Sequence, residues 1–99
     1  MSIATSITKI LMDITGEPKL EPAIMEILKD AVEHRIEKIE GEIRIYEKKY
    51  NMSFEEFREK FEKDEIESSY SYEIEMDYFE WEGLVTRLRK YTDILKQLK

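Results

Sequence analysis

The sequence predicts an all-α protein: a long antiparallel helical hairpin with a short bridging helix and a short N-terminal helix, forming one domain over residues 1–99. Three observations predict this class. Two long segments, 22–50 and 73–98, repeat apolar residues at spacings of three and four, the period of a helix face. The whole chain holds only two prolines and three glycines, so few residues interrupt these segments. A helix-capping pattern between them indicates a shorter helix.

The N-terminal segment, residues 1–21, contains the pattern of a short helix over 3–14. Its apolar residues fall at i, i+4, i+7, i+8 and i+11 and share one helix face: Ile3, Ile7, Ile10, Leu11 and Ile14. Because four of these are β-branched, a short strand stays open as an alternative. Gly16 suits a C-terminal cap and Pro18 cannot continue a helix, so the segment ends there.

The long helix is predicted over residues 22–50, where Pro22 fits the first turn. Its seam recurs at spacings of four and three: Val32, Ile36, Ile39, Ile43, Tyr46 and Tyr50. At a rise of about 1.5 Å per residue, the helix is a rod on the order of 40 Å long. Gly41 is its only glycine, and it marks either a close helix approach or a weak point.

The short helix is predicted over residues 53–63 from its start signal. Ser53 stands three residues before Glu56, as in a capping box, and Met52 and Phe57 occupy the positions of a hydrophobic staple. Asn51 suits a left-handed cap that ends the long helix. One face of the short helix carries Phe54, Phe57 and Phe61. We therefore expect this helix to turn the chain and cover one end of the core.

An acidic loop over residues 64–72 leads to the C-terminal helix, 73–98, whose cap is either Ser71 or Asp77. The apolar seam of this helix has spacings of three and four: Trp81, Leu84, Leu88, Tyr91, Leu95 and Leu98. We expect Tyr78 to join it in the core. Packing two seams against each other in a two-helix hairpin leaves part of the apolar surface uncovered. The sequence therefore also predicts a homodimer, in the form of a helical bundle.

Charge and composition exclude several classes of protein. The formal net charge of −7 argues against binding nucleic acid, which needs a basic surface. Since no apolar run approaches the ~20 residues of a membrane span and no secretory signal is visible, we expect no membrane association and a cytoplasmic location. The chain lacks cysteine, which excludes disulfides and thiolate metal sites. One Asn and one Gln beside abundant Glu and Lys are typical of a thermophile.

Catalysis finds little support, and we expect neither an enzyme nor a cofactor. The only histidine, His34, lies among charged residues, and no nucleophile–base pattern surrounds it. A di-iron bundle needs Glu-x-x-His, but Ala31 stands three residues before His34. A ribbon–helix–helix DNA reader would want alternating basic and polar residues in "SIATSITKILMDIT", residues 2–15, which offer only Lys9.

The region around residues 62–82 is the candidate for binding a partner. Residues 51–82 carry twelve acidic against three basic side chains, and five aromatic residues cluster between 70 and 81. Tyr and Trp are enriched at binding hot spots, and an acidic field steers basic partners. The candidate partner-binding residues are Tyr70, Tyr72, Glu73, Glu75, Asp77 and Phe79. Two alternatives remain: a self-associating scaffold homodimer and a carboxylate-rich metal-binding bundle.

The segment from Ile43 to Tyr91 resembles the C-terminal half of a group of small prokaryotic antitoxins, found largely in archaea and thermophilic bacteria. The resemblance lies in "EKKYNMSFEEF", a third Phe at 61, an acidic gap and "EWEGL" at 80–84. It implies a non-catalytic protein that binds and neutralises a cognate toxin, often a ribonuclease or nucleotidyltransferase. Many antitoxins also have an N-terminal DNA-binding domain, and residues 1–22 show no such module.

Overall fold

The computed structural model describes residues 2–66 and 71–98, and it confirms the all-α class. The described residues form four helices and no strand: α1 (Ile3–Thr15), α2 (Leu20–Tyr50), α3 (Phe54–Glu62) and α4 (Tyr72–Gln97). The N-terminal segment is therefore a helix, and the alternative of a strand is wrong. The molecule is elongated, with principal extents of 60 × 25 × 18 Å.

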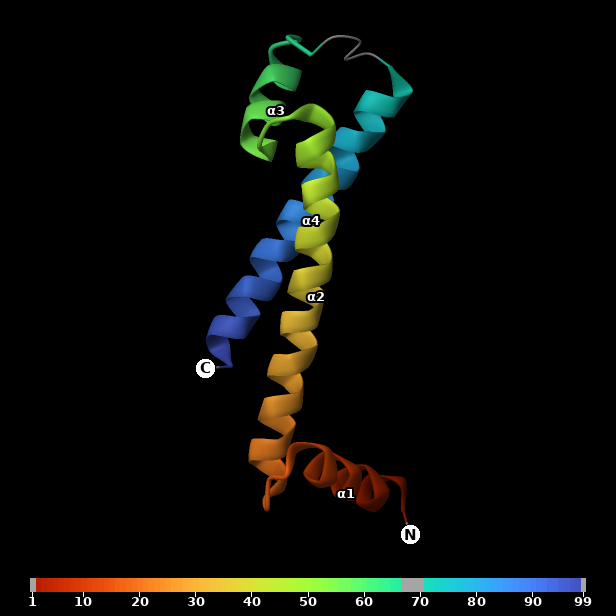
Figure 1. The fold of residues 1–99 in the computed structure, drawn as a ribbon, viewed down its shortest axis with the longest axis vertical. Helices are drawn as coiled ribbons and strands as arrows, with labels where there is room; N and C mark the ends of the chain where they lie inside the picture. Colours follow the sequence, from red (N-terminus) through yellow and green to blue (C-terminus); the bar gives the residue numbers. More distant parts are fainter. Residues whose placement is uncertain (1, 67–70, 99) are drawn as a thin grey trace.

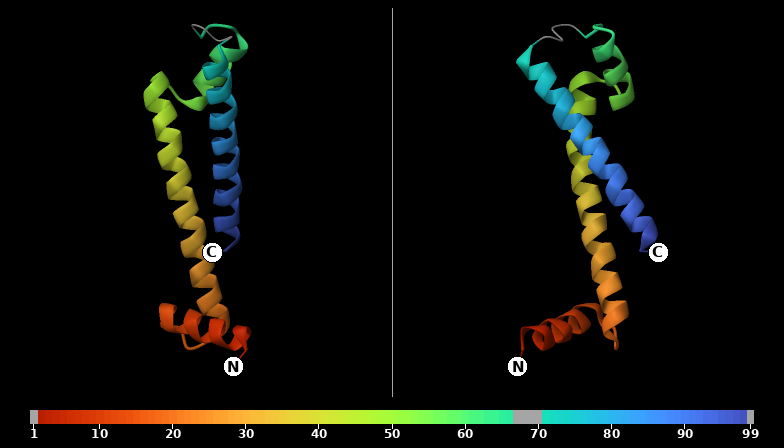
Figure 2. Two further views of the ribbon diagram at one scale, coloured as in Figure 1. Left: turned by 90° about the vertical axis from the view of Figure 1, so that its right-hand side faces the viewer. Right: turned by 180° about the vertical axis from the view of Figure 1, so that it is seen from behind.

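Helices α2 and α4 form the predicted antiparallel hairpin (Figure 1). Seen from behind, in the right-hand view of Figure 2, they cross near the end that α3 covers and diverge toward the C-terminus. At the other end, α2 extends beyond the end of α4, and α1 lies across its first turns. The structure is of a single chain, and the dimeric bundle stays a prediction.

The helix ends follow local capping chemistry. Asn51 adopts the left-handed conformation (φ 54°), and its backbone N–H donates to the Glu47 carbonyl, which ends α2. The Ser53 side chain accepts a hydrogen bond from the Glu56 N–H at the start of α3. Ser71 does the same for the Ile74 N–H, so Ser71 is the cap of α4 and Asp77 lies inside the helix.

The buried core lies at the α3 end of the hairpin. Its members come from three helices: Ile39, Ile43, Phe54, Phe57, Tyr78, Trp81 and Leu84. Other apolar residues pack against them while partly buried, among them Phe61, Leu88 and Tyr91; Leu95, nearer the C-terminus, is also partly buried. We call this end the head: α3 together with residues 39–50 of α2 and 72–84 of α4.

The opposite end, which we call the base, consists of α1 and residues 20–28 of α2. Here Ala23 is the one buried residue, and α1 contributes none. Gly16 (φ 73°) ends α1 in the left-handed conformation and lets the chain turn into α2. No helix among the described residues is both long and apolar enough to cross a membrane.

Candidate functional site

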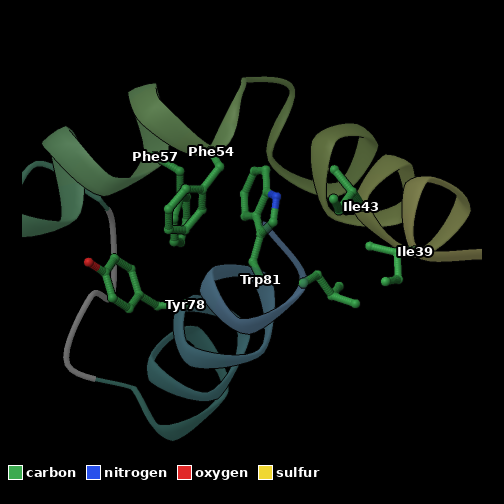
Figure 3. Packing of buried hydrophobic residues seen from close by; sticks show 7 residues of the cluster. Ile39, Ile43, Phe54, Phe57, Tyr78 and Trp81 are labelled. Atoms are coloured by element: carbon green, nitrogen blue, oxygen red, sulfur yellow. The ribbon is translucent and has the colours of Figure 1, made fainter. Parts of the chain in front are cut away.

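The head is built around the indole of Trp81, which projects from α4 between α3 and α2 (Figure 3). Phe57 and Phe54 of α3 lie 5.1 and 5.4 Å from it, measured between ring centroids. On the α2 side, Tyr46 and Tyr50 stack at 5.7 and 6.0 Å. Aromatic pairs of this kind each contribute about 0.5–1.5 kcal/mol beyond the area they bury. The cluster therefore fixes α3, α2 and α4 as one unit.

A polar layer beside these rings joins the end of α2 to the start of α4. Lys49 Nζ lies 2.6 Å from Asp77 Oδ2 and 2.7 Å from Glu73 Oε1, and it forms an ion pair with both. The Tyr50 hydroxyl also donates to Asp77. One turn further along, the Tyr46 hydroxyl donates to Glu80 Oε2 at 2.5 Å. Three acidic residues of α4 thus have partners within the molecule.

These contacts shift the pKa values of the groups that donate in them. The hydrogen bond to Glu80, helped by burial, raises the pKa of Tyr46 to about 12. Burial, then the bond to Asp77, raises the pKa of Tyr50 above its ordinary value. The bonds to Asp77 and Glu73 raise the pKa of Lys49. At neutral pH both tyrosines are therefore protonated and Lys49 is charged.

The six residues proposed from the sequence to bind a partner fall into different settings. Asp77 turns inward, with a side chain only 13% exposed, while the Glu73 side chain is paired but still 74% exposed. Tyr72 and Phe79 are 77% and 62% exposed, and Glu75 is exposed. Tyr70 lies outside the described residues. The structure thus leaves Tyr72, Glu75 and Phe79 available on the outer surface of α4.

Two of these residues belong to an apolar stripe that sequence reasoning missed. Tyr72, Met76, Phe79 and Gly83 follow each other at i, i+4, i+7 and i+11. At about 100° per residue they fall within an arc of roughly 60°, on the side of the helix opposite Trp81. We call them the α4 stripe. The spacing was visible in the sequence, but only packing shows that this face of α4 points away from the core.

Acidic residues flank the α4 stripe on both sides. In the same projection Glu75 and Glu82 lie along one edge, and Glu73 and Glu80 lie along the other. A stripe of this kind is apolar in the middle and acidic at its rims, the usual pattern of a protein interface with charge complementarity.

A groove of about 490 Å³ adjoins the α4 stripe, between α4 and α2. Phe79 and Gly83 form part of its α4 wall, and Ile45 forms part of its α2 wall. Ile45 is itself exposed, although it lies within the head. The site also includes one cation, Arg87, opposite Glu42. The groove extends the apolar surface of the stripe sideways toward α2.

A metal site was one alternative from the sequence. Within residues 2–66 and 71–98, no three or more His, Cys, Asp or Glu side chains form a group that could hold a metal ion. His34 is exposed on α2, in the long stretch between base and head.

The fold and the head define an all-α protein built on a long helical hairpin, with an acid-rimmed apolar surface beside a closed aromatic core. The chain belongs to the Uncharacterized protein MJ0235 family, whose model matches residues 1–99. The match covers the whole chain, whereas the antitoxin resemblance covers residues 43–91. Comparisons with curated proteins and with solved structures found no match.

Proposed function

We propose that this chain is a non-catalytic protein–protein interaction module that binds a basic partner protein through its head. The observation that carries the proposal is the α4 stripe, an exposed apolar surface with acidic rims. A helix needs only one apolar face to pack in its own fold, and α4 already uses the opposite face for Trp81 and Leu84. The α4 stripe, on the second face, is therefore not needed for packing within one chain.

The chemistry of the stripe specifies the kind of partner. Large exposed apolar side chains such as Tyr72 and Phe79 gain free energy when covered, about 1.5–3 kcal/mol for full burial of an aromatic or aliphatic side chain. The acidic rims favour lysine and arginine around the covering surface. An amphipathic helix with an apolar face and basic flanks meets both requirements.

The sequence resemblance points to the same type of protein. Antitoxins bind and neutralise a cognate toxin without catalysing a reaction, and a toxin that acts on RNA or nucleotides needs a basic surface. We therefore propose that the partner is a basic toxin and that the head of this chain covers part of its surface. The acidic residues of the head would speed the encounter by long-range attraction.

The experiment mixes the purified chain with the product of the adjacent gene and follows association at low and high salt. We expect a complex whose association slows as salt rises, because screening weakens the attraction. Failure to form any complex at low salt would count against the antitoxin role.

A charge reversal locates the binding surface. Glu75→Lys changes a rim residue that has no ion pair among the described residues, so the fold should tolerate it. We expect the association rate to fall at least about threefold. Glu37→Lys is the matched control, with the same charge change at an exposed position of α2 far from the stripe. Equal rates for the two variants would contradict steering by the head.

A further inference from the structure

A second apolar stripe lies at the base, on α1. Ile3, Ile7, Ile10 and Ile14 are between 49% and 79% exposed. Their spacing is again i, i+4, i+7 and i+11, which places them within an arc of roughly 60° on the helix. We call them the isoleucine stripe. Soluble monomers seldom expose a contiguous row of large aliphatic side chains.

Helix α1 packs on α2 with a different face. Its partly buried residues are Ser6, Thr8, Leu11, Met12 and Thr15, and α2 presents the buried Ala23 among its first turns. The Thr15 hydroxyl donates to the Leu11 carbonyl, so this polar group is satisfied within α1. The face that meets α2 is thus half polar, while four isoleucines point elsewhere. Packing within one chain therefore leaves the most apolar face of α1 uncovered.

The start of α2 adds to this uncovered surface. Leu20, Ile24 and Leu28 repeat at i, i+4 and i+8 and are 38–43% exposed. Helix α4 does not reach this part of α2, because the two helices diverge and α4 ends earlier (Figure 2). Seven large aliphatic side chains are consequently exposed at the same end of the molecule.

We propose that the isoleucine stripe is the interface of a homodimer, in which the stripes of two copies cover each other across a two-fold axis. An interface on such an axis uses the same patch from both subunits, and a straight apolar row on a helix is complementary to its own copy. The exposed aliphatic surface of the base is on the scale of several hundred Å², near the ~800 Å² that each partner contributes to a stable interface.

The charge of α1 favours a second copy of this chain, over a basic partner protein, as the molecule that covers the isoleucine stripe. Helix α1 carries one cation and one anion, Lys9 and Asp13, and has no net charge. Two α1 helices therefore approach each other without net charge repulsion, whereas two heads, each rich in acid, repel. A basic partner gains nothing from the neutral α1 surface. In an antiparallel pair of α1 helices, the positive end of each helix dipole lies beside the negative end of the other. Helix α1 has no acidic first turn or basic last turn that would offset its own dipole.

The inference goes beyond the proposed function, because it concerns the other end of the molecule and needs no partner protein. A dimer joined at its bases leaves both heads uncovered, at the far ends of the assembly. Each dimer would then offer two α4 stripes.

The test measures the molar mass of the purified full chain in solution by size exclusion with light scattering. We expect the wild type at micromolar concentration to show twice the mass of one 12.0 kDa chain. Ile10→Lys should reduce the mass twofold, because it puts a charge in the middle of the stripe. Ile45→Lys is the matched control at an isoleucine of the head, which is 65% exposed against 54% for Ile10, and this variant should remain a dimer.

Three results would overturn the proposal: a monomeric wild type, a dimeric Ile10→Lys protein, or an Ile45→Lys variant that alone becomes monomeric. Far-ultraviolet circular dichroism checks that each variant folds. Should Ile10→Lys unfold, Ile3→Lys replaces it, since Ile3 is the most exposed residue of the stripe.

Crosslinking provides an independent measurement. The chain has no cysteine, so one introduced cysteine can only form a disulfide between two molecules. We expect oxidised Ile7→Cys or Ile10→Cys to give a covalent dimer at least tenfold faster than Ile45→Cys. Equal rates at all three positions would indicate random collision and contradict a specific interface.

Discussion

The α4 stripe and the isoleucine stripe have the same spacing along their helices, yet they differ in what surrounds them. The α4 stripe is rimmed by glutamates and lies over a closed core, with Trp81 on the opposite side of the helix. The isoleucine stripe lies on a helix without net charge and without a single buried residue. Periodicity alone identifies both as apolar faces. The charge beside each face, and the packing behind it, indicate which partner it meets.

The same contrast applies to stability. The head buries large side chains from three helices together, while the base buries only Ala23. Burial of large side chains is the main favourable term in folding, so the head carries most of the free energy of unfolding. Helix α1 then depends on a partly polar contact with α2, and dimerisation would stabilise it.

The largest expected effect tests where this stability lies. Trp81→Ala removes the centre of the aromatic cluster and should lower the free energy of unfolding by about 3–5 kcal/mol. Leu11→Ala in α1 should cost only about 1 kcal/mol, because that side chain is partly buried. Urea unfolding followed by circular dichroism measures both. Similar losses at the two positions would contradict a stability concentrated in the head.

A milder change at the same position tests the polar part of the indole. Among the described residues, the buried Trp81 Nε1–H has no hydrogen-bond acceptor. An unsatisfied buried donor costs about 1–3 kcal/mol. Trp81→Phe removes this donor along with some ring contact, so it should destabilise the protein much less than Trp81→Ala.

The next effect concerns the polar layer that joins α2 to α4. Asp77→Ala leaves the Tyr50 hydroxyl and Lys49 without their shared acceptor, and it should cost about 1–3 kcal/mol. Glu73→Ala removes the other ion pair of Lys49, but that carboxylate is mostly exposed, so its loss should cost under about 0.5 kcal/mol. Thermal unfolding distinguishes the two. A cost at Glu73 as large as at Asp77 would show that exposure does not govern these pairs.

Asp77 also shows which features of the site could not be predicted from the sequence. Its residue type and spacing fit both a helix cap and a partner-binding acid, whereas the structure places it inside α4, bonded to Lys49 and Tyr50. Lys49 and Asp77 are 28 residues apart, so their pairing depends on the register of α2 against α4. A pattern within one helix contains no information about that register.

Local chemistry was more predictable. The caps at Asn51 and Ser53 depend on neighbouring residues only, and both have the expected hydrogen bonds. The seam of α4 likewise follows from the helix period, which brings Trp81 and Leu84 into the core. The N-terminal segment left helix and strand open, because its β-branched residues and its period point in opposite directions. The segment is a helix, as its period indicates, although the isoleucine face that this period defines is exposed.

The third effect is a dependence on alkaline pH, which arises in the head. Because the hydrogen bond to Glu80 raises the pKa of Tyr46 to about 12, the protonated phenol is favoured in the folded state. Its contribution is complete below the ordinary value of 10.0 and is lost as the pH rises through about 12. For this partly exposed group we expect a loss of about 1 kcal/mol.

Urea unfolding at several alkaline pH values measures this loss. Tyr46→Phe should reduce the slope of the free energy of unfolding against pH. It should not abolish the slope, since the pKa values of Tyr50 and Lys49 are also raised and contribute with the same sign. An unchanged slope would show that the Tyr46–Glu80 hydrogen bond does not form in solution.

The smallest effect on stability is the most informative about the α4 stripe. Glycine inside a helix costs about 0.5–1 kcal/mol relative to alanine, and a Cβ added at Gly83 would meet no atom within 4 Å. At Gly41 in α2, an added Cβ would meet only the flexible end of Arg44, at 3.7 Å. Alanine at either position should therefore stabilise the free protein by about 0.5–1 kcal/mol.

Binding should separate these two variants. Gly83 lies in the α4 stripe and in the wall of the adjoining groove, so an added methyl group stands where the partner would approach closely. We expect Gly83→Ala to weaken partner binding while Gly41→Ala leaves it unchanged, as titration calorimetry of both would measure. If the two variants gain the same stability and bind equally well, the bare surface at Gly83 is not a contact. Contact with the partner would then be confined to the rest of the α4 stripe, Tyr72, Met76 and Phe79, and to its acidic rims.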